Sequence, residues 1–317
     1  HRSQAKLIRA PPKSHAMTIL SLEYLKQQAS EEAPFEADVY QQQLTTQLLE
    51  VGLDALRGEL WRIRDQFDET VSETLKGHPR IANYPTGFCL EISIGVLQLL
   101  NQAITSSTTP VMRALNNFIA NGGRVKRIWG NLRHQYFQNA MQWGSLYVDV
   151  ANDSVDRKKP KIEILPFAEA NLHPINDYDS YAALAETYWK GKIYPNRYCP
   201  HLAPMFPLLL MYPNGKWQLH SCYQTMLFQS LVSDFELAEH AIFSGNYASR
   251  RIAEAELKLL QKQFERAQMG NFFCTHAADD TLLQSRFADA RRSELRFDAK
   301  KLQALLDQAQ HINRFAL

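Results

Sequence analysis

Apolar residues recur at helical spacing through the first half of the chain. Between residues 35 and 76 they form a stripe that predicts one broken helix or a pair of antiparallel helices, interrupted at Gly52 and Gly58. After a turn, a second stripe starts at Cys89 and predicts a hydrophobic helix to about residue 100. A third helix is expected over residues 111–120, where two glycines then end it.

From residue 124 the pattern becomes extended. Segments rich in β-branched or aromatic residues, or with alternating polarity, predict strands at Arg124–Trp129, His134–Gln138, Ser145–Val150, Lys161–Leu165 and Tyr188–Tyr194. Trp143-Gly144-Ser145 is expected to turn one strand back on the next. Asn214-Gly215 predicts a hairpin within residues 208–220, because this dipeptide favours the tight turn between two antiparallel strands.

Helical periodicity returns near Ser233 and is clearest over residues 250–269 and 298–312. The order of elements predicts an α+β fold, in which a cysteine-bearing helix packs on an antiparallel sheet between N-terminal and C-terminal helices. We expect a flexible lead over residues 1–30, an α+β domain over residues 31–230 and a helical region over residues 231–317.

The composition is that of a soluble globular protein, with 45% hydrophobic and 21% charged residues among 317. A net charge of +2 gives no electrostatic reason to expect nucleic acid or an anionic membrane as a partner. No apolar run is long enough for a membrane span, and no signal-peptide pattern opens the sequence. We expect a protein that is cytoplasmic, or secreted into a host cell without a cleaved signal peptide.

Four scattered cysteines indicate reduced thiols, not a disulfide framework. Cys89 is the one near a predicted helix N-terminus, where unpaired backbone N–H groups and the helix dipole favour a thiolate. The alternative interpretation is an inert thiol in the apolar core.

A nucleophilic thiol needs a base and a group that orients this base. His134 follows Cys89 by 45 residues, and Asp149 follows His134 by 15, an interval that spans two predicted strands and a turn. On adjacent antiparallel strands, the two side chains could meet. Asp149 also stands in the apolar stretch LYVDV, where a carboxylate requires a partner. Asp153 and Asp156 are alternatives for this third position.

The order of GFCLE, the histidine that opens HQYFQ and the aspartate of LYVDV resembles the papain-like and transglutaminase-like superfamily of Cys-His-Asp enzymes. The short interval from cysteine to histidine is similar to that in bacterial toxin and effector deamidases and proteases, and in arylamine N-acetyltransferases. The sequence lacks the arginine and paired glycines that usually precede the cysteine of the acetyltransferases.

This resemblance implies that Cys89 attacks an amide carbonyl to form a thioester, with His134 carrying the proton and Asp149 orienting the histidine. Asn83 is placed like the oxyanion-hole amide of papain-type enzymes. The implied activity is glutamine deamidation or proteolysis of a protein substrate, such as a host-cell protein met by a bacterial effector, with no cofactor. Acyl transfer to an amine is an alternative, and a non-catalytic helical adaptor with an inert Cys89 is another.

A second pattern pairs Cys199-Pro200-His201 with His220-Ser221-Cys222. Alternate positions on two strands share a face, so Cys199, His201, His220 and Cys222 could surround zinc. Their spacing is not that of a common zinc ribbon, and we expect no metal there.

Overall fold

The computed structural model describes residues 20–78, 80–106, 108–220 and 223–316. Their backbone contacts divide the chain into two compact units. Of the described residues, the first unit contains 31–174, and the second contains 20–30 together with 175–316. Both units combine helices with antiparallel strands, which confirms the expected α+β class. The division near residue 174 differs from the expected domain boundary at residue 230.

The helices of the first unit follow the apolar stripes of the sequence. After the last residues of α1 (Leu22–Glu32), they are α2 (Val39–Leu49), α3 (Leu53–Thr74), α4 (Cys89–Ser106) and α5 (Pro110–Ala120). The side chains of Asp38 and Thr109 accept the first backbone N–H groups of α2 and α5, as good N-caps do. The predicted break occurs at Gly52, which has a positive φ, whereas Gly58 lies inside α3.

Five strands form the antiparallel sheet of this unit in the order β4-β3-β2-β1-β5. They are β1 (Val125–Leu132), β2 (Tyr136–Trp143), β3 (Leu146–Asp149), β4 (Glu163–Pro166) and β5 (Leu172–His173). The predicted turn at Gly144 joins β2 to β3. The short α6 (Phe167–Ala170) lies between β4 and β5 in the chain, so the segment crosses from one edge of the sheet to the other.

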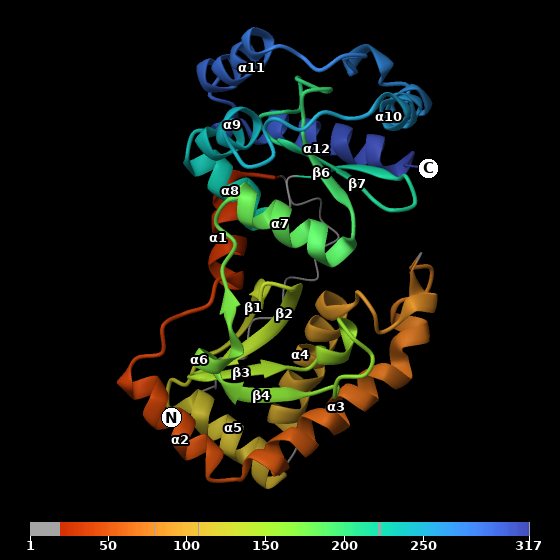
Figure 1. The fold of residues 1–317 in the computed structure, drawn as a ribbon. Helices are drawn as coiled ribbons and strands as arrows, with labels where there is room; N and C mark the ends of the chain where they lie inside the picture. Colours follow the sequence, from red (N-terminus) through yellow and green to blue (C-terminus); the bar gives the residue numbers. More distant parts are fainter. Residues whose placement is uncertain (1–19, 79, 107, 221–222, 317) are drawn as a thin grey trace. The chain divides into compact units, whose positions relative to one another are not determined.

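The two faces of this sheet have different cores. One face packs on α3, α4 and α5 (Figure 1), and its buried residues include Met141 and Val148. The other face carries a smaller cluster that includes Ala140, Tyr147 and Leu172 of β5. Because neighbouring strand residues point to opposite faces, the sheet register decides which side chains can meet the helices.

The second unit has a three-stranded antiparallel sheet in the order β6-β7-β8, with helices around it. Its strands are β6 (Lys192–Pro195), β7 (Leu208–Met211) and β8 (Trp217–His220), and the turn at Asn214-Gly215 closes the expected hairpin. The helices after α1 are α7 (Tyr178–Trp189), α8 (Tyr223–Val232), α9 (Glu236–Phe243), α10 (Glu254–Arg266), α11 (Asp280–Arg292) and α12 (Ala299–Arg314).

Three expected segments differ from the structure. Residues 22–30 of the expected flexible lead belong to α1, while residues 1–19 lie outside the described part of the chain. His134 lies in the turn between β1 and β2, not in a strand. Tyr188 and Trp189 end α7, and Lys190 in a left-handed conformation separates them from β6.

Candidate functional site

Cys89 is the first residue of α4, at the helix N-terminus that the sequence predicts. The helix packs against β2, and Ser93 donates a hydrogen bond to the backbone carbonyl of Asn139 (2.9 Å). The side-chain amide of Asn139 donates to the Cys89 sulfur, with 3.5 Å between Nδ2 and Sγ. The residue that faces the thiol from the sheet is therefore an asparagine.

Asn139 is held in this orientation by its own neighbours. Arg127 donates from Nη1 to the Asn139 amide oxygen (2.9 Å) and from Nη2 to Glu32 Oε1 (3.1 Å). With its oxygen occupied by a guanidinium, the amide must turn its NH₂ group toward Cys89. The chain of contacts from Glu32 to Cys89 thus presents a fixed donor to the sulfur.

The electrostatics at Cys89 favour the neutral thiol. Burial raises the pKa of the Cys89 thiol, and the nearby carboxylates of Asp149 and Glu91 raise it further. Hydrogen bonds from the side chain and backbone of Asn139 act in the opposite direction, without reversing the shift. The helix N-terminus is present as expected, and the sum of burial, carboxylate charge and hydrogen bonds still raises the pKa of the thiol.

His134 lies at the tip of the hairpin between β1 and β2. Both Arg133 and His134 have φ of 56°, the left-handed conformation that tight hairpin turns require. The Nδ1 atom of His134 lies 3.3 Å from the amide nitrogen of Asn131, and its ring stacks on that of His173 at 5.1 Å. The first contact is within the hairpin, and the second joins its tip to β5.

Asp149 ends β3 and is completely buried. It accepts hydrogen bonds from Gln138 Nε2 (2.6 Å), the Tyr147 hydroxyl (3.0 Å) and the backbone N–H of Ala151 (2.8 Å). Burial raises the pKa of Asp149 to about 6 despite these three donors. The expectation that this carboxylate needs a partner is met, but by Gln138 and Tyr147 instead of His134.

The structure does not bring the three predicted catalytic residues together. His134 precedes Tyr136, whereas Asp149 follows Val148, which pairs with Met141. Five residues of strand, about 17 Å, separate Tyr136 from Met141. Asp149 also shares the sheet face of Tyr147, while Cys89 lies on the face that packs against the helices. His134 and Asp149 thus do not form the expected pair: His134 contacts Asn131, and Asp149 accepts a hydrogen bond from Gln138.

Asn83, the expected oxyanion-hole amide, is exposed at the end of the short helix η1 (Ile81–Asn83). Its backbone carbonyl accepts a hydrogen bond from Arg157 (2.7 Å), which also binds Tyr84 and Thr86 and fixes the turn before α4. The amide that contacts the thiol is that of Asn139.

A second polar centre, not predicted from the sequence, surrounds the completely buried Arg64 of α3. Arg64 donates to Asp68 (2.8 Å), to both carboxylate oxygens of Asp153 (2.9 and 3.2 Å), to the Val150 carbonyl (2.7 Å) and to Tyr84 (3.4 Å). These contacts use all five guanidinium N–H groups, so Arg64 has no donor left for a ligand.

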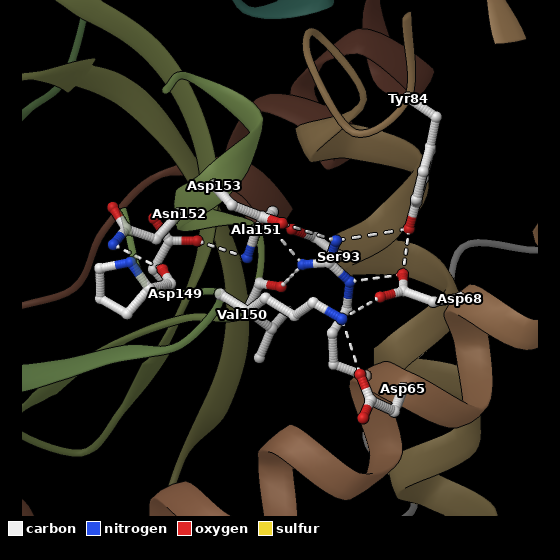
Figure 2. A network of polar contacts seen from close by, with 12 residues as sticks. Asp65, Asp68, Tyr84, Ser93, Asp149, Val150, Ala151, Asn152 and Asp153 are labelled. Atoms are coloured by element: carbon white, nitrogen blue, oxygen red, sulfur yellow. Dashed lines mark hydrogen bonds and ion pairs between the residues drawn. The ribbon is translucent and has the colours of Figure 1, made fainter. Parts of the chain in front are cut away.

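Figure 2 shows Asp65, Asp68, Tyr84 and Asp153 converging on this centre. Tyr84 donates to Asp68, and Lys161 bridges Asp65 and Asp68 at 2.7 Å each. Although burial opposes it, the hydrogen bonds from Lys161 and Tyr84 lower the pKa of Asp68. The centre ties α3 to the segment after β3, and the four-residue spacing of Arg64 and Asp68 was its signal in the sequence.

The residues of the alternative zinc site have other contacts. His201 Nε2 pairs with Gln308 (3.2 Å), and His220 lies between the Tyr181 hydroxyl (3.0 Å) and Gln218 (2.9 Å). Cys222 lies outside the described residues. Within residues 20–316, apart from the undescribed positions, no group of three or more His, Cys, Asp or Glu side chains has metal-binding geometry.

Comparison with protein-family models, curated proteins and solved structures found no match to this chain. No helix among the described residues is both long and apolar enough to cross a membrane.

Proposed function

We propose that this chain is a non-catalytic binding protein, an adaptor in which Cys89 is a structural thiol. The observation that carries the proposal is the asparagine opposite Cys89. In the described part of the chain, no histidine or carboxylate hydrogen-bonds to the thiol. An amide donor cannot remove the thiol proton, and thiol-dependent amide hydrolysis requires this step.

The raised pKa of Cys89 supports the same proposal. A thiol that stays protonated at neutral pH is a poor nucleophile, because the thiolate is the reactive form. Its contacts with the apolar residues of α4 and the sheet are those of a small core side chain.

One observation favours the second candidate, a thiol-dependent amide hydrolase acting on a protein: Cys89 does begin an 18-residue helix beside an antiparallel sheet. In this candidate Cys89 remains the nucleophile. His134 and Asp149 would have to move from their present contacts to serve it. This second candidate would be an enzyme of the papain-like or transglutaminase-like superfamily.

Alkylation of the native protein by iodoacetamide, followed across pH with mass-spectrometric assignment of each cysteine, distinguishes the two candidates. The adaptor proposal predicts that Cys89 reacts more slowly than in the urea-unfolded chain and shows no reactive fraction below pH 8. Cys274, also partly exposed, is the internal comparison. Rapid labelling of Cys89 at pH 6–7 that disappears in His134→Ala would overturn the proposal.

A further inference from the structure

The second unit contains an open groove of about 630 Å³ between two helices. One wall is formed by Arg286, Asp289 and Ala290 of α11 with its C-cap Ser293. The other is the α12 face with Lys301, Ala304, Leu305 and Gln308. On each helix these positions are spaced i, i+3, i+4 and i+7, so they form a continuous stripe. The volume lies within the range of small-molecule binding sites.

The floor of the groove is apolar and its rim is cationic. Among the lining residues, Pro204, Ala290 and Leu295 are buried, and the exposed Ala304 has only a small side chain that leaves room in the groove. Arg286, Arg292 and Lys301 all line the opening. This combination suits a ligand with an apolar body and an anionic group.

Arg286 is the cation best placed to receive that anionic group. Arg292 pairs with Asp289 (2.9 Å) and Lys301 with Asp298 (3.0 Å), in exposed ion pairs that contribute little stability. Arg286 makes no hydrogen bond or ion pair with any residue that the structure describes. Its guanidinium is free to form a bidentate contact with a carboxylate or phosphate.

His201 supports the placement of Arg286 at the groove. Burial lowers the pKa of His201, and the charge of Arg286 lowers it further against the opposing hydrogen bond to Gln308. His201 is thus neutral at pH 7, and the positive potential of the groove comes from its arginine and lysine side chains.

We propose that this groove binds a small amphipathic anion, in which a carboxylate or phosphate contacts Arg286 and an aliphatic or aromatic body covers Pro204, Leu295 and Leu305. This inference rests on the proposed binding function and names its ligand class. The alkylation experiment tests Cys89 and leaves the groove untouched, so the two proposals can fail separately.

The test is isothermal titration of the full chain with decanoate below its critical micelle concentration. We expect saturable 1:1 binding, weakened about tenfold by Arg286→Gln because a charge-assisted contact is lost. Arg266→Gln is the matched control, since Arg266 is an exposed arginine on α10 away from the groove. It should bind decanoate as the unchanged protein does.

A second variant tests the apolar part of the groove. Ala304 is exposed, so Ala304→Phe should leave the melting temperature unchanged while its ring fills the groove and removes decanoate binding. Equal binding of decyltrimethylammonium, or decanoate affinity unchanged in both Arg286→Gln and Ala304→Phe, would overturn the proposal. Binding of inorganic phosphate as tight as that of decanoate would also contradict it, because the apolar body would then contribute nothing.

Discussion

At the scale of single residues, the clearest consequence of the structure concerns Asp149, a carboxyl group whose ionisation is unfavourable in the folded state. Its pKa is raised to about 6 by burial, against about 3.9 in an unfolded chain. The folded protein therefore holds a proton between these two values that the unfolded chain has released. The stability that Asp149 contributes is fully present below pH 4 and is lost as the pH rises through 6.

Asp149→Asn should remove this pH dependence, because asparagine does not titrate. Urea unfolding at a series of pH values between 4 and 7.5 measures the pH dependence of the free energy of unfolding. The free energy of unfolding of the unchanged protein, minus that of the variant, should fall by about 2 kcal/mol over this range. Asp156→Asn, at an exposed turn, is the control and should keep the original slope. Parallel curves for Asp149→Asn and the unchanged protein would show that Asp149 ionises freely.

The buried Arg64 gives a second prediction at this scale. Arg64→Met would leave Asp68 and Asp153 without their buried cation, and removing one partner of a buried ion pair typically costs about 3–5 kcal/mol. Arg57→Met on the same helix loses only an exposed pair with Asp54 and should cost less than about 1 kcal/mol. Chemical denaturation measures both. A difference below 1 kcal/mol between the variants would mean that the centre around Arg64 is not a stabilising one.

At the scale of elements, two glycine turns with similar backbone conformations should respond differently to the same substitution. Gly144 between β2 and β3 has φ of 55°, and an added Cβ would lie 2.2 Å from Thr45 Oγ1 of α2. Gly215 between β7 and β8 has φ of 81°, but its nearest neighbour would be Leu259 Cδ1 at an ordinary 3.6 Å. A substitution at either site is strained by the left-handed conformation, but only the substitution at Gly144 also causes a steric clash.

We therefore expect Gly215→Ala to cost about 1 kcal/mol and Gly144→Ala to cost about 1–3 kcal/mol more. Thermal unfolding followed by circular dichroism compares the two. Similar losses of stability would indicate that Thr45 can move aside, and that α2 does not pack rigidly on the turn at Gly144.

The periodicity of the sequence predicted most helices and the turns at Gly144 and Gly215, because these depend on local spacing and on residues that tolerate a positive φ. It did not predict which side chain faces Cys89. A strand at His134–Gln138 would have allowed the His134 side chain to contact Asp149 on the adjacent strand. The strand instead begins at Tyr136, and register then puts Asn139 opposite the thiol. The start and register of this strand are set by tertiary packing, and the local sequence pattern carries no information about that packing.

At the scale of the whole molecule, the boundary between the units explains why a sequence-based division at residue 230 differs from the structure. β8 depends on the C-terminal helices: Asn313 of α12 exchanges hydrogen bonds with the backbone of Leu219 (2.9 and 3.2 Å). Gln263 of α10 donates to the carbonyl of Trp217 (3.1 Å). The strands at residues 192–220 thus belong with helices far along the chain, which no change of composition marks.

This dependence predicts how two fragments behave. Residues 31–174 contain both cores of the first sheet and should fold alone, with a single cooperative thermal transition and a monomeric elution volume. Residues 31–230 add β6, β7 and β8 without α10 and α12, leaving uncovered the backbone of Leu219 and the side of β8 that packs on α12. An exposed apolar sheet is prone to edge-to-edge pairing, so the longer fragment should aggregate and bind anilinonaphthalene sulfonate strongly. If the longer fragment were instead monomeric and bound no more dye than the shorter one, the C-terminal helices would not be part of the core of the second unit.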